Sequence, residues 1–110
     1  SSGIYVAQLF QQMGIADQLK PKSVLVQGGL AAERIVDGKA DVALQQSCEL
    51  MGMPGVQFVG PIPLMLQNYT IYSGGVSVAS HNRAAADALL LALANPENGK
   101  ILKSKGLDSP

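Results

Sequence analysis

Ser23-Val24-Leu25-Val26-Gln27-Gly28-Gly29 joins a run of aliphatic, partly β-branched residues to a pair of glycines. Such a run is typical of a short strand, and the glycines predict a turn directly after it. Residues Leu30–Val36 then have helical spacing up to Asp37-Gly38, and Asp41–Gln45 predicts a second strand. The order strand, glycine turn, helix, strand is the βαβ unit of a parallel sheet. We therefore expect an α/β fold with a short, mainly parallel sheet flanked by helices.

Helices and strands are also expected outside this unit. Gly3–Met13 places apolar residues on one face of a helix, with Ser1 or Ser2 as its N-cap and Gly14 at its end. The prolines of Gly60–Gln67 predict a linker. Further helices are expected at Ala16–Leu19, Arg83–Ala94 (capped by Asn82 or Ser80) and Glu97–Lys105, and further strands at Val56–Val59, Tyr69–Tyr72 and Val76–Ala79.

The composition excludes several classes of protein. Hydrophobic residues make up 47% of the 110 residues and charged residues 15%, which excludes a disordered tail. Eight basic residues balance eight acidic ones, so the chain lacks the basic field that nucleic acid requires, and no nucleic-acid partner is expected. No apolar run is long enough for a transmembrane helix. Because the chain starts at Ser1-Ser2-Gly3 without an initiator methionine, we expect an excerpt of a longer protein.

Residues for catalysis are sparse. Cys48 is the only cysteine and His81 the only histidine, and nothing in their spacing requires the hydrogen bond of a nucleophilic pair. Glu33 and Asp37 fall four positions apart, with Arg34 nearby, which favours a solvated helix face over an acid–base pair. No cluster has the spacing of metal ligands. We therefore expect no enzyme activity, no metal and no cofactor.

Three polar clusters are better candidates for a binding site. Gly28-Gly29 precedes a helix start, where backbone N–H groups are free to hold an anion and glycine allows close approach. Ser1-Ser2-Gly3 opens another helix. The third cluster, Gln45-Gln46-Ser47, follows the expected strand residues Val42-Ala43-Leu44. If a strand preceded Ser1, all three would lie at the carboxyl ends of strands in a parallel sheet. The alternative is that these residues only form caps and turns.

Several stretches of the chain resemble the second lobe of periplasmic molybdate-binding proteins, and together they span most of its length. The stretches are Ser2-Gly3-Ile4-Tyr5, Met13-Gly14-Ile15-Ala16-Asp17, Lys22–Gly29, Val36–Leu44, Val56–Pro63 and Ala94–Glu97 through Lys105–Leu107.

The resemblance implies a partial type II periplasmic-binding-protein fold and an extracytoplasmic or periplasmic receptor of an ABC importer. Such a receptor closes two lobes over a small oxyanion and delivers it to a membrane permease. The ligand-binding residues that it implies are Ser2, Gly28 or Gly29, and Gln46 or its neighbour Gln45. Glutamine stands there in place of the family's tyrosine, so a different oxyanion or a small organic acid remains an alternative to molybdate.

The resemblance also divides the chain. Residues 1–66 would form the α/β ligand-binding part, and residues 67–110 the hinge return and C-terminal helices. Because the helix Arg83–Ala94 is apolar over most of its circumference, we expect the chain to self-associate. Two alternatives stay open: a stand-alone α/β interaction module, or a small enzyme subunit that uses the glycine-rich turn.

Overall fold

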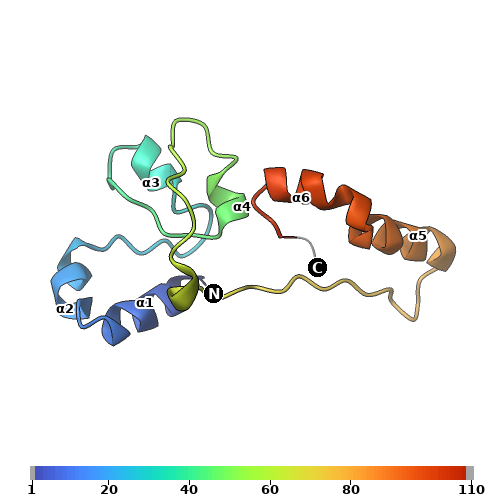
Figure 1. The fold of residues 1–110 in the computed structure, drawn as a ribbon, viewed down its shortest axis with the longest axis horizontal. Coiled ribbons are helices and arrows are strands. Elements are labelled where there is room, and N and C mark those ends of the chain that lie inside the picture. Colours follow the sequence, from blue (N-terminus) through green and yellow to red (C-terminus); the bar gives the residue numbers. More distant parts are fainter. Residues whose placement is uncertain (1, 109–110) are drawn as a thin grey trace. The chain divides into compact units, whose positions relative to one another are not determined.

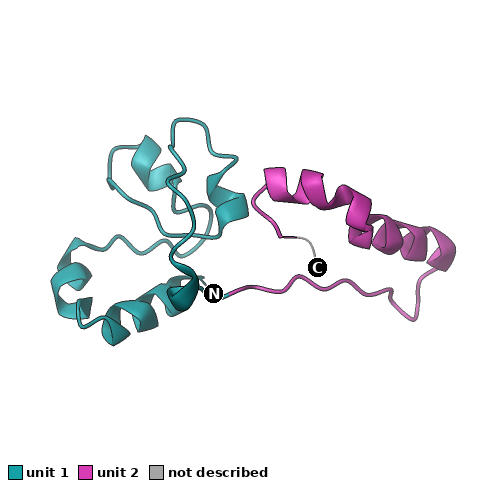
Figure 2. Cartoon of the chain, viewed as in Figure 1, with its two compact units in different colours: residues 1–68 teal, residues 69–110 magenta. Residues whose placement is uncertain are grey.

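A computed structural model describes residues 2–108, and it divides the chain into two units, residues 1–68 and 69–110 (Figure 2). Each unit is described by itself. The division expected from the sequence for functional reasons, into residues 1–66 and 67–110, stays a prediction.

The first unit consists of short helices joined by long irregular segments (Figure 1). The longest helix is α1 (Ser2–Gln12), and it ends where Gly14 takes the left-handed conformation, with a φ of +69°. The remaining helices are short: α2 (Ala16–Leu19), α3 (Glu33–Val36), α4 (Ser47–Leu50) and the 3₁₀ turns η1 (Lys20–Lys22) and η2 (Leu64–Leu66).

The helices at the start of this unit are the ones that the sequence predicts. The predicted helix Gly3–Met13 is confirmed as α1 and the predicted turn Ala16–Leu19 as α2, and these two helices pack against each other. After α2 the chain tightens into η1 at Pro21, and the Ser23 hydroxyl donates a hydrogen bond to the Leu19 carbonyl at 2.8 Å. Of the two expected N-caps, Ser2 lies inside α1, and Ser1 lies outside the described residues.

The second unit begins with an extended stretch and continues into two helices (Figure 1). The predicted helix Arg83–Ala94 is confirmed as α5, and its predicted cap Asn82 accepts a hydrogen bond from the Ala85 N–H at 3.4 Å. The expected final helix is split into the 3₁₀ turn η3 (Pro96–Asn98) and α6 (Gly99–Ser104). Asn98 fastens this turn to α5, because its side-chain amide donates to the Ala92 carbonyl.

The prediction of a parallel sheet is wrong. Across residues 2–108 the structure contains helices and irregular segments but no β-strand. The stretches expected as strands therefore have no ladder; they are Ser23–Gln27, Asp41–Gln45, Val56–Val59, Tyr69–Tyr72 and Val76–Ala79. Their apolar side chains are left largely exposed, with Leu25 at 80%, Val42 at 74% and Val59 at 95%. A strand exists only with a partner in register, and an aliphatic run specifies no such partner by itself.

The expected helix Leu30–Val36 also differs from the structure. Residues 30–32 form a turn, and the single helical turn α3 begins only at Glu33. The apolar residues that are buried in the described part are Leu9, at 6% exposure, and Ala32, at 0%. Ala32 lies three residues after Gly29 in the sequence.

Candidate functional site

The Gly28-Gly29 turn presents backbone donors, as the sequence predicts. Gly29 has a φ of +78°, whereas Gly28 is not in the left-handed region. Within residues 2–108, the N–H groups of Gly28, Gly29 and Leu30 donate no hydrogen bond. Three consecutive backbone donors without protein acceptors form a partial positive charge that suits an anion.

Gln45 lies at this turn. Its side-chain oxygen Oε1 accepts a hydrogen bond from the Ala31 N–H at 2.8 Å, and the contact is partly buried. This bond joins two positions that are 14 residues apart in the sequence. The structure therefore brings together two of the three polar clusters expected from the sequence, although no sheet places them there.

Gln46 is oriented differently from Gln45. It precedes α4, and its backbone carbonyl accepts hydrogen bonds from the N–H groups of Glu49 and Leu50. Its side-chain oxygen faces Cys48, whose thiol lies 3.9 Å from Oε1. Gln46 thus stands at the N-cap position of α4, and the ligand-binding role that the resemblance assigns to it stays a prediction.

Ser2 lies in the first turn of α1 and is half-buried. Among the described residues it makes no hydrogen bond to the glycine turn or to Gln45 and Gln46. The role that the resemblance assigns to Ser2 stays a prediction.

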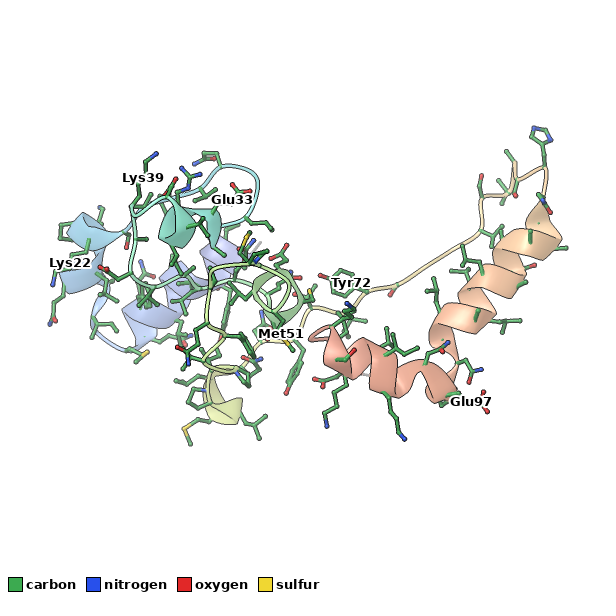
Figure 3. All side chains as sticks on the ribbon, turned by 90° about the horizontal axis from the view of Figure 1, so that it is seen from above. Lys22, Glu33, Lys39, Met51, Tyr72 and Glu97 are labelled. Atoms are coloured by element: carbon green, nitrogen blue, oxygen red, sulfur yellow. The ribbon has the colours of Figure 1, made fainter. Side chains whose placement is uncertain are left out.

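A cluster of charged side chains lies on α3 and directly after it, where the sequence predicted only a solvated helix face. Arg34 bridges Asp37 at 2.9 Å and Glu33 at 3.7 Å, and Lys39 approaches Asp37 at 3.6 Å. Figure 3 labels Glu33 and Lys39 at the two ends of this segment. The spacing of Arg34 and Asp37 along a helix is the signal that could have revealed their ion pair.

Glu33 has a second neighbour, the glycine turn. A Cβ atom placed on Gly29 would lie 3.5 Å from the Glu33 carboxylate oxygen Oε2. An anion that binds to the N–H groups of the turn would therefore have a negative charge close by. The sequence predicted neither this proximity nor its electrostatic effect.

The residues considered for catalysis or metal binding are distributed over both units. Cys48 belongs to the first unit, and His81 is exposed in the turn before α5 of the second unit. Over residues 2–108, no group of three His, Cys, Asp or Glu side chains is arranged to hold a metal ion. In that same part of the chain, every helix is too short or too polar to cross a bilayer.

Comparison with known proteins identifies the family. The sequence profile of the bacterial extracellular solute-binding proteins matches residues 1–108, so the chain belongs to this family. A relative from Pseudomonas sp., named aconitate isomerase, is 32% identical over 108 residues. These residues cover 97% of this chain and 41% of the relative, so the chain spans about two-fifths of that relative's length. No solved structure matches the chain significantly.

The relative corrects one expectation from the sequence. We expected no enzyme activity because the chain lacks a paired acid and base. A relative with an isomerase's name contradicts this expectation, because it shows that the family is not restricted to proteins without catalytic function.

Proposed function

We propose that this chain is the anion-binding part of an extracytoplasmic receptor. The observation that carries the proposal is the set of N–H donors at Gly28, Gly29 and Leu30, with the Gln45 amide fastened beside them. Membership of the extracellular solute-binding proteins supports a small solute as the ligand. Backbone and amide N–H groups suit a solute whose oxygens accept hydrogen bonds.

The ligand class is a small oxyanion, either a tetrahedral one such as molybdate or a carboxylate. The resemblance described above supports molybdate. The aconitate in the relative's name supports a carboxylate. The receptor would be periplasmic and would deliver its ligand to the permease of an ABC importer.

Calorimetric titration with molybdate, sulfate, citrate and aconitate tests this proposal and distinguishes a tetrahedral oxyanion from a carboxylate as the ligand. We expect one of these anions to bind, and Gly29→Val to weaken its binding at least about tenfold, because the branched side chain resists a positive φ. Gly52→Val is the matched control, since Gly52 has open space around it and no positive φ. Equal affinities for the two variants would place the ligand elsewhere.

Glu33 provides a test in the opposite direction. Replacing its carboxylate by an amide in Glu33→Gln removes a negative charge beside the turn, so anion binding should become stronger. Glu97→Gln, in the other unit, is the control for net charge and should leave the affinity unchanged. A weaker affinity for Glu33→Gln would contradict the placement of the anion at this turn.

We also propose that the chain works as part of a longer, two-lobed protein, which the 41% coverage of the relative supports. A ligand held between two lobes loses part of its donors when one lobe is missing, and each charge-assisted hydrogen bond contributes about 1.5–3 kcal/mol. We therefore expect the 110-residue chain to bind the anion more weakly than a protein that includes both lobes. Equal dissociation constants would contradict the two-lobed site.

A second candidate function is isomerisation of a small carboxylic acid, and the relative's name is the observation that favours it. Proton NMR of aconitate incubated with the longer protein distinguishes the two candidates. Accumulation of a second isomer would support the enzyme. Binding without any change in the aconitate spectrum would support the receptor.

A further inference from the structure

We propose that Gln45 is the positioning residue of the candidate site, an inference that rests on the proposed function and specifies it further. Its side-chain oxygen accepts a hydrogen bond from the glycine turn, and its amide N–H₂ group donates to an oxygen of the ligand. The relevant contact is the 2.8 Å hydrogen bond from the Ala31 N–H to Gln45 Oε1.

The chemistry of this bond fixes the orientation of the side-chain amide. A backbone N–H can only donate, so the atom that faces Ala31 must be the amide oxygen and not the nitrogen. The nitrogen Nε2 is therefore on the side of the amide away from the Ala31 N–H. Within the described residues it donates to no protein acceptor. Its two hydrogens remain available to a ligand oxygen.

The bond also has a mechanical consequence for the turn. Gly29 has a positive φ, and its neighbours Gly28 and Leu30 donate no hydrogen bonds, so few local bonds hold this segment. Ala31 directly follows the three free N–H groups, and Ala32 is fully buried. The hydrogen bond between Ala31 and Gln45 thus holds the segment that carries the three free N–H groups to a residue 14 positions further along the chain.

Two substitutions of Gln45 separate its role as the acceptor for the Ala31 N–H from its role as a donor to the ligand. In Gln45→Glu a carboxylate oxygen still accepts from the Ala31 N–H, but the N–H₂ donors are lost and a negative charge is added. In Gln45→Met, which has a similar size, the acceptor and the donors are both lost. Gln57→Met is the matched control, because Gln57 is exposed and lies outside the site.

The first measurement is NMR on the unmodified chain. We expect a scalar coupling across the hydrogen bond, between the Ala31 amide nitrogen and the Gln45 side-chain carbonyl carbon. Amide exchange at Ala31 should become about three- to tenfold faster in Gln45→Met, as expected for one lost hydrogen bond, and should stay slow in Gln45→Glu and Gln57→Met. An absent coupling in the unmodified chain overturns the proposal without any variant having to fold.

The second measurement is titration with molybdate and with citrate. For the anion that binds, Gln45→Glu should lower the affinity at least about tenfold although Ala31 stays protected, because a carboxylate repels the anion and offers no donor. Unchanged affinity of Gln45→Glu would overturn the donor role of Gln45. If neither anion binds to the unmodified protein, the proposed ligand class is wrong, and the Ala31 measurements still decide whether Gln45 fastens the turn.

Discussion

Gly28 and Gly29 are neighbours with different conformational requirements. Gly29 has a φ of +78°, which L-residues other than Gly adopt at a cost of about 1–2 kcal/mol. Gly28 has no positive φ and nothing within 4 Å of the position that a Cβ atom would take. The two substitutions Gly28→Ala and Gly29→Ala therefore add the same methyl group with different consequences.

We predict that Gly29→Ala lowers the free energy of unfolding of the first unit by about 1–2 kcal/mol more than Gly28→Ala does. Urea titration followed by circular dichroism measures this difference. Equal effects of the two substitutions would mean that the turn relaxes to a negative φ at little cost.

The candidate site could be predicted from the sequence only in part. Glycines after an aliphatic run are a local signal that indicated a turn at Gly28 and Gly29, but the helix expected to start directly after them begins only at Glu33. The partner of the turn was not predictable, because the bond between Gln45 and Ala31 depends on the path of the 14 residues between them. The adjacent residues Gln45 and Gln46 look equivalent in the sequence, and nothing in the sequence indicates that Gln45 bonds to the Ala31 N–H.

The same distinction between local and distant signals holds for the secondary-structure elements. Helix α5 was predicted with its bounds because Asn82 caps it and Ala and Leu fill it, and a helix closes its hydrogen bonds within four residues. Strands at Ser23–Gln27 and Asp41–Gln45 were predicted wrongly because each needs a neighbour that its own residues do not specify. The aliphatic runs indicated a preference for extended backbone but not a pairing.

We predict that Asn82→Ala destabilises α5 by about 0.5–2 kcal/mol, because the Ala85 N–H loses its side-chain acceptor. Helicity measured by circular dichroism during thermal unfolding should fall at a lower temperature than in the unmodified chain. Asn68→Ala, an exposed position outside the helices, is the control and should have no effect. Unchanged helix stability in Asn82→Ala would show that water replaces the cap without cost.

At the scale of the whole molecule, the main feature is the exposed apolar surface of the described residues. On α5 the side chains of Leu89, Leu91 and Leu93 are 60%, 73% and 57% exposed. Leu89 and Leu93 lie four positions apart and therefore share a face of the helix. Burying one leucine fully contributes about 1.5–3 kcal/mol, so contact between copies is favourable.

We therefore predict that the 110-residue chain forms dimers or larger oligomers in solution, with these leucines at the contact. Light scattering at rising protein concentration measures the mass. The double substitution Leu89→Gln with Leu93→Gln should shift the mass toward the monomer, whereas Lys100→Gln on α6 should not. A monomeric mass at high micromolar concentration would contradict this prediction.

The extended stretch from residue 69 to residue 77, visible between the last 3₁₀ turn of the first unit and α5 in Figure 1, has one more consequence. It enters no β-ladder within the described residues; Ile71 is 86% exposed, and Val78, in the turn that follows the stretch, is 98% exposed. Between Glu49 and Arg83 the sequence contains no Asp, Glu, Lys or Arg, so this stretch carries none of these charged side chains to oppose stacking of identical chains.

High β-propensity, low net charge and the absence of proline favour cross-β stacking when copies of a chain meet, and this stretch has all three although Gly74-Gly75 interrupts it. On prolonged incubation we expect the chain to develop thioflavin fluorescence and a reflection near 4.7 Å in fibre diffraction, at the spacing of stacked strands. Ile71→Lys should delay fibril growth by adding one positive charge to every layer of the stack, and Ile101→Lys, on α6, should not. The side chains from which strands were predicted in this stretch would then pack between stacked copies of the chain rather than within a sheet of one molecule.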